Sequence, residues 1–144
     1  MTNEEVEQKM AALHSNVGEI MMYCQLIEEN VKRILSHMRP GNPNINRLAI
    51  ENEKMTLGKV IMEMKELDER SRDSFFSSSD YDKLFGITKT RNEYAHGLYT
   101  QFCYLDNKDE FDASLLRCYN HSLTDKAWLS ALYDAVEDAR LAYE

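Results

Sequence analysis

An arginine, an asparagine and a histidine lie close together in the segment RNEYAHG, as Arg91, Asn92 and His96. A guanidinium group can hold a phosphate through two parallel hydrogen bonds. A histidine side chain can transfer a proton near neutral pH. Together these two groups are the minimum parts for cutting RNA without a metal ion, so we interpret the three residues as a candidate ribonuclease site.

An α-helix would place Asn92 and His96 on one face, with Tyr99 on the same side, but would separate Arg91 from His96 by about 140°. One helix therefore cannot easily direct Arg91 and His96 at the same phosphate. Two copies of the chain related by a two-fold axis remove this difficulty, because Arg91 of one copy can approach His96 of the other. The geometry predicts a homodimer whose cleft holds two His96 side chains.

In such a cleft one His96 would act as general base on a ribose 2′-hydroxyl, and the other would protonate the departing 5′-oxygen. Arg91 would stabilise charge on the phosphorane, and Asn92 would orient an imidazole or the phosphate. The expected products carry a 2′,3′-cyclic phosphate and a 5′-hydroxyl. Lys89 and Tyr99 are the expected supporting or RNA-contacting residues, and no cofactor is expected.

The composition is that of one helical domain, which we expect to span residues 1–144. Only five glycines and two prolines occur, a proportion that favours helices. The net charge of −8 argues against a general nucleic-acid surface. The charge is uneven, however: residues 83–105 carry three basic residues and one acidic residue, whereas residues 63–82 carry three basic and seven acidic residues. A locally positive helix could focus a phosphate there, although a solvated helix face explains these charges equally well.

Neither cysteines nor histidines form a recognisable metal or disulfide framework. The cysteines are odd in number and lack a CxxC pair, so we expect reduced, mostly packed thiols; they are Cys24, Cys103 and Cys118. The other histidines lack a second ligand at metal-binding spacing; they are His14, His37 and His121. No apolar run is long enough to span a bilayer, and we expect a cytoplasmic protein with no membrane partner.

The first forty residues predict one long helix. Thr2 and Glu5 have the spacing of a capping box, and Pro40 ends the pattern. Between them apolar residues recur at alternating spacings of three and four: Val6, Met10, Leu13, Val17, Ile20, Cys24, Ile27, Val31, Ile34 and Met38. This heptad stripe is typical of a core helix in a bundle, and it could also contribute to a dimer interface.

Three further helices are predicted after a polar loop that contains Asn42, Asn44, Asn46 and Asn52. The second helix carries Leu57, Val60, Ile61, Met64 and Leu67, and the segment DSFFSSSD follows it. Ser79 or Asp80 would cap the third, whose stripe is Leu84, Ile87, Arg91, Ala95, Leu98 and Phe102. Thr124 would cap the fourth, which carries Trp128, Leu129, Leu132, Val136, Ala139 and Tyr143.

Residues 105–122 have no clear period, and both a short helix and an extended segment are compatible with them. The expected fold class is all-α: an up-and-down bundle of about four main helices with a long N-terminal helix.

The pattern R-N-x-x-x-H, late in a predicted helical bundle, resembles the Arg-polar-x3-His motif of the HEPN superfamily. The resemblance implies an all-α, commonly dimeric domain. Many members are metal-independent endoribonucleases of toxin–antitoxin, abortive-infection and CRISPR systems, with a site formed by two copies of the motif. Carried onto this chain, the resemblance implies that Arg91, Asn92 and His96 are catalytic. In members silenced by a nucleotidyltransferase antitoxin a tyrosine follows the histidine by two positions, where this chain has Leu98, with Tyr99 next to it.

Three functional readings follow. The first is a homodimeric HEPN-type endoribonuclease, a toxin or phage-defence effector that acts on RNA and is held in check by an antitoxin or regulatory protein. The second is a catalytically silent HEPN-like module that binds or regulates protein partners. In the third, a structural adaptor uses the heptad stripe as its main surface. His96 could also be purely structural, bonded to a backbone carbonyl or to Tyr99.

Overall fold

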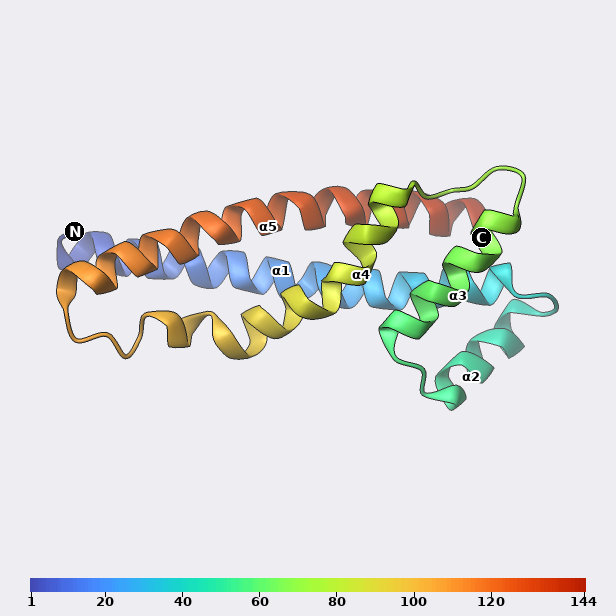
Figure 1. Ribbon diagram of the computed structural model, residues 1–144, viewed down its shortest axis with the longest axis horizontal. Helices are drawn as coiled ribbons and strands as arrows, with labels where there is room; N and C mark the ends of the chain where they lie inside the picture. Colours follow the sequence, from blue (N-terminus) through green and yellow to red (C-terminus); the bar gives the residue numbers. More distant parts are fainter. The chain divides into compact units, whose positions relative to one another are not determined.

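The computed structural model describes residues 1–144 and is built entirely from helices, with no strand. Figure 1 shows the five α-helices, α1 (Asn3–Met38), α2 (Pro43–Glu53), α3 (Leu57–Arg70), α4 (Ser78–Asn92) and α5 (Lys108–Tyr143). A π-helical turn, η1 (Glu93–Gly97), and a 3₁₀ turn, η2 (Tyr99–Gln101), lie between α4 and α5. The all-α prediction is confirmed, and the expected number of helices was one too small. None of the helices combines the length and apolar character that crossing a membrane requires.

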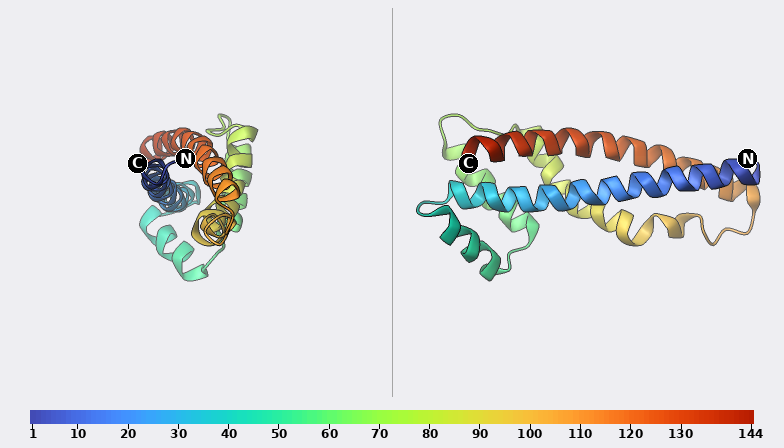
Figure 2. Two further views of the ribbon diagram at one scale, coloured as in Figure 1. Left: turned by 90° about the vertical axis from the view of Figure 1, so that its left-hand side faces the viewer. Right: turned by 180° about the vertical axis from the view of Figure 1, so that it is seen from behind.

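The chain forms two compact units. Unit 1 contains residues 1–24 and 89–130, and unit 2 contains residues 25–88 and 131–144. In unit 1 the first part of α1 lies beside the first part of α5 and the segment that holds η1 and η2 (Figures 1 and 2). Unit 2 contains α2, α3 and most of α4 with the remaining parts of α1 and α5.

The long first helix forms as the sequence predicts. The Thr2 Oγ1 atom accepts a hydrogen bond from the Glu5 backbone N–H at 3.1 Å, and the Glu5 carboxylate accepts one from the Thr2 N–H at 2.7 Å. This reciprocal pair is the expected capping box. The middle of the heptad stripe is fully buried within the chain: Leu13, Ile20, Cys24, Ile27, Val31 and Ile34. These six residues are core, whereas Val6, Met10, Val17 and Met38 of the stripe are half-buried.

The asparagine-rich segment after α1 is a helix, so the prediction of a polar loop was wrong. The Asn42 side chain accepts hydrogen bonds from the N–H groups of Asn44 and Ile45 and caps α2, whose first residue is Pro43. The Asn46 amide donates to backbone carbonyls at the end of α1, at 2.9 Å from Ser36 O and 3.1 Å from Arg39 O. These asparagines are capping residues for two successive helices.

The segment between α3 and α4 is held by one buried carboxylate. Asp68 accepts hydrogen bonds from the backbone N–H groups of Phe75 and Phe76, and from the Tyr81 hydroxyl at 2.5 Å. The cap of α4 is Ser77, which exchanges hydrogen bonds with Asp80, rather than Ser79 or Asp80 itself.

The last helix corrects two expectations. Residues 108–122 belong to the same 36-residue helix as the predicted fourth helix. Thr124 is inside that helix, and its hydroxyl donates to the Asn120 carbonyl. Asn107 lies just before the helix and accepts a hydrogen bond from the Glu110 N–H at 3.0 Å. The buried stripe of this helix runs without a break: Leu115, Cys118, Ser122, Asp125, Leu129, Leu132, Val136 and Ala139.

Candidate functional site

The segment RNEYAHG is where the helix geometry changes. The third predicted helix was expected to continue as an α-helix through Phe102, but α4 ends at Asn92 and η1 follows. The Leu98 N–H donates to the Glu93 carbonyl at 2.8 Å, a bond across five residues instead of four. Single π-helical turns of this kind are rare and often occur at functional sites. The expectation that Asn92 and His96 share a face assumed α-helical spacing, which the structure does not keep here.

Arg91 and Asn92 lie in the last turn of α4, and His96 lies in η1. Arg91 is half-buried, whereas Asn92 and His96 are exposed. The His96 ring makes no hydrogen bond, ion pair or ring contact, so the structure does not show the alternative considered above, a structural bond to a carbonyl or to Tyr99. Lys89, one turn before Asn92, is exposed as well.

Tyr99 contacts His14, and not His96, which was the partner considered from the sequence. Its hydroxyl lies 2.6 Å from Nδ1 of His14 in α1, and the two rings are 5.3 Å apart. Tyr99 also contacts the ring of Phe102, and partial burial raises the pKa of its phenol. Tyr99 therefore anchors η2 to α1 within unit 1, and its hydroxyl is already occupied by His14.

A buried carboxylate that sequence reasoning missed anchors the π-helical turn to α5. The Asp125 side chain, 10% exposed, accepts a hydrogen bond from the Tyr94 hydroxyl at 2.5 Å and one from the Trp128 indole N–H at 2.8 Å. Burial, and then this bond to Asp125, raises the pKa of Tyr94. Asp125 occupies a core position in the stripe of α5, and this spacing was a signal of its burial. An acidic residue interrupts an apolar pattern, however, so the position was not recognised as core.

His121 lies between two carboxylates next to this anchor. Its Nε2 atom is 3.1 Å from Glu93 Oε1 and 3.0 Å from Asp125 Oδ2. The imidazole is stacked on the Tyr94 ring with an angle of 8° between the planes. Glu93 opens the turn that carries His96, so His121 joins α5 directly to the candidate site.

A cavity of about 220 Å³ opens beside this group, within unit 1. It is lined by Glu93, Leu98, Gln101, Arg117, Cys118 and His121. Leu98 and Cys118 are buried, and burial raises the pKa of the Cys118 thiol. The cavity thus combines an apolar part with charged and amide groups, and neither His96 nor Arg91 lines it.

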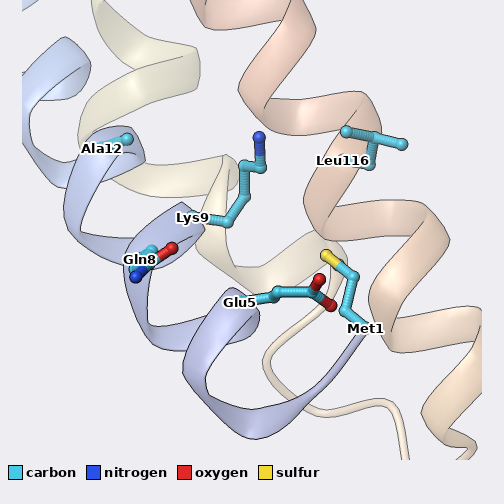
Figure 3. Close-up of a pocket in the computed structure, with 6 residues that line it drawn as sticks. All are labelled: Met1, Glu5, Gln8, Lys9, Ala12 and Leu116. Carbon is cyan, nitrogen blue, oxygen red and sulfur yellow. The ribbon is translucent and has the colours of Figure 1, made fainter.

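A larger cavity, of about 380 Å³, lies at the beginning of α1 and α5. Figure 3 shows Met1 beside Glu5 at one end, Lys9 further along α1, and Leu116 on α5. None of the residues predicted to do chemistry lines this cavity. Its greater size does not make it the better candidate, because the unusual backbone and the convergent polar groups lie at η1.

The three cysteines differ in their exposure to solvent. No disulfide joins the three cysteines; Cys24 and Cys118 are buried, and Cys103 is exposed. The prediction that most of the thiols are packed agrees with this arrangement, and Cys103 is the exception.

No protein-family model, no curated protein and no solved structure matches this chain.

Proposed function

We propose that the chain is a metal-independent endoribonuclease of the HEPN type, with Arg91, Asn92 and His96 as its catalytic residues in a composite dimer site. The exposed His96 imidazole carries this proposal. It lies on a π-helical turn just after Arg91 and Asn92, and no group of its own chain occupies it. A structural histidine would normally have a hydrogen-bond partner, since buried or fixed polar groups are almost always paired.

The reaction would be an in-line attack of a ribose 2′-oxygen on the adjacent phosphorus. One His96 takes the 2′-hydroxyl proton as the new P–O2′ bond forms, and the other gives a proton to O5′ as the P–O5′ bond breaks. Arg91 stabilises the negative charge of the phosphorane. Both electrons of the broken bond leave with O5′, and the products are a 2′,3′-cyclic phosphate and a 5′-hydroxyl.

A dimer supplies the second histidine. The chain has only four histidines, and the structure gives the others different surroundings: His14 at Tyr99, His121 at Glu93 and Asp125, and His37 near Tyr143. A second copy related by a two-fold axis would bring its own His96 to the same cleft. In the wider proposal, a toxin or phage-defence effector of this kind would be held in check by an antitoxin or regulatory protein.

The test is incubation of the purified protein with total cellular RNA in EDTA, followed by mapping of the fragment ends. Variants His96→Gln and Arg91→Lys are compared with the wild type. Glutamine keeps a polar side chain but cannot transfer a proton, and lysine keeps the charge but loses the bidentate guanidinium. We expect both to reduce cleavage by at least about 100-fold.

His37→Gln is the matched control, because it removes a histidine from unit 2 and should leave cleavage unchanged. Circular dichroism and light scattering verify the fold and oligomeric state of each variant. Cyclic phosphate ends that disappear in both site variants would support the nuclease. A wild type that cleaves nothing, or variants that cleave as well as the wild type, would overturn the proposal.

A further inference from the structure

The 220 Å³ cavity beside the π-helical turn has the size and chemistry of a site for one planar base. Clefts that take drug-sized ligands have volumes of about 300–1,000 Å³, so a smaller ring system suits this one. Its apolar lining residues are Leu98 and Cys118, both of which are buried. The other lining residues can donate or accept hydrogen bonds.

The charges around the cavity favour a neutral ligand. Glu93 and Arg117 both line it, so an anion would meet the Glu93 carboxylate and a cation would meet the Arg117 guanidinium. Asp125 adds negative charge behind His121, at 3.0 Å from its Nε2 atom. A neutral ring with donors on one edge and acceptors on another satisfies both sides without an unpaired charge.

We propose that this cavity binds a guanine base. Guanine carries two neighbouring donors, N1–H and the N2 amino group, which a carboxylate such as Glu93 can accept together. Its O6 and N7 acceptors match a guanidinium, the commonest specific contact to this base. Adenine, cytosine and uracil each lack the pair of adjacent donors. A carboxylate accepts in several directions, so the contact of Glu93 with His121 leaves capacity for the base.

Arg117 is available for this role. It is exposed, and its guanidinium donates to Ser114 Oγ at 3.2 Å on its own helix. Gln101 lines the same cavity, and its amide oxygen lies 3.6 Å from Cys118 Sγ. As the pocket that selects the base next to the cleaved phosphate, the site rests on the proposed nuclease function. The binding of guanine itself does not depend on that function and is argued from the cavity alone.

The experiment is calorimetric titration of the full chain with the 5′-monophosphates of guanosine, adenosine, cytidine and uridine. We expect guanosine monophosphate to bind at least about tenfold more tightly than the other three. Glu93→Gln should abolish this preference, because an amide cannot accept both donors. Arg117→Ala should weaken the binding of guanosine monophosphate more than the binding of the other three nucleotides. Glu110→Gln, an exposed glutamate in the first turn of α5, is the matched control and should bind like the wild type.

The outcomes separate this site from the proposed cleavage. Selective binding of guanosine monophosphate that Glu93→Gln abolishes supports the site, even where no RNA is cut. Equal binding of all four nucleotides, or none, overturns the site, even where RNA is cleaved. Arg117 is exposed on α5, so Arg117→Ala provides a second variant if Glu93→Gln disturbs the π-helical turn. A folded Arg117→Ala protein that keeps the wild-type selectivity also contradicts the proposal.

Discussion

Replacement of Asp125 by alanine should destabilise unit 1 strongly, because this carboxylate is the acceptor for several groups at once. The Tyr94 hydroxyl and the Trp128 indole N–H donate to its two oxygens at 2.5 and 2.8 Å, and His121 Nε2 lies 3.0 Å away. Alanine would leave the buried Tyr94 donor without an acceptor. Trp128 and His121 are closer to water, which can replace part of what they lose.

The size of the effect follows from counting these donors. A buried donor without a partner costs about 1–3 kcal/mol. Tyr94 is buried, so its loss takes the upper part of this range, about 2–3 kcal/mol. Trp128 is half-buried, so its loss takes the lower part, about 1–2 kcal/mol. Together they predict a cost of about 3–5 kcal/mol for Asp125→Ala. Domains of this size are stable by only about 5–15 kcal/mol. The melting temperature should therefore fall by roughly 10 °C.

Urea unfolding followed by circular dichroism and by fluorescence measures this cost. Trp128 is the only tryptophan of the chain, so fluorescence reports on unit 1. Asp134→Ala, at an exposed position of the same helix, is the matched control and should change the free energy of unfolding by less than about 0.5 kcal/mol. Tyr94→Phe, which leaves Asp125 with its other partners, should cost about 1–2 kcal/mol. An Asp125→Ala protein as stable as the control would refute the assigned role of the carboxylate.

Burial raises the pKa of Tyr81 and of Tyr94 above the usual value of 10.0. The unfolded chain therefore loses these two protons at a lower pH than the folded chain does. The stability that the protonated tyrosines contribute to the folded state is complete below about pH 10. It is lost as the pH rises toward the folded pKa, by about 1.4 kcal/mol per pH unit for each tyrosine. Urea midpoints of Tyr81→Phe and Tyr94→Phe between about pH 9 and 11.5 should fall less steeply than that of the wild type, and parallel curves would contradict this. Asn46→Asp should destabilise the chain by about 1–2 kcal/mol more than Asn46→Ala, because it places a negative charge on the carbonyls at the end of α1; equal unfolding midpoints would be the contrary result. In equal mixtures of exchanged wild-type and His96→Ala subunits, cleavage should fall to about a quarter if both histidines are needed, whereas a residual half would mean independent sites.

The sequence predicted the helices whose core stripes are apolar, although Asn16 of α1 and Asp68 of α3 are buried beside those stripes. The stripe of α1, the capping box of Thr2 and Glu5, and the apolar face of α3 are all present. These features depend on local spacing alone, and a single sequence displays local spacing completely. The prediction also found the stop between α3 and α4, because turn-forming residues interrupt the pattern there.

The failures occur where polar side chains have their partners outside their own helix. The sequence placed Asn46 in a loop, because its role as a capping residue depends on hydrogen bonds to carbonyls at the end of the preceding helix. The first half of α5 lost its period because Ser122 and Asp125 occupy core positions, where they pair with Asn16 and Tyr94. Polar residues become acceptable in a core only when such partners exist. Spacing alone cannot show those partners, so the helix was divided at Thr124.

For the same physical reason, the sequence revealed the candidate site only in part. Arg91, Asn92 and His96 were recognisable by residue type, but the π-helical turn was not, because its bond from Leu98 to Glu93 leaves no mark in the spacing. Tyr94 and Leu98 are buried, and His96 between them is exposed. Tyr94 is held by Asp125, so this hydrogen bond anchors the turn that carries the His96 backbone. If the proposed nuclease is correct, Tyr94→Phe should lower cleavage at a temperature where the protein remains folded, with the pH profile of cleavage unchanged, since Tyr94 positions His96 and takes no part in proton transfer. A stable Tyr94→Phe protein with full activity would show that the turn keeps His96 in place without this hydrogen bond.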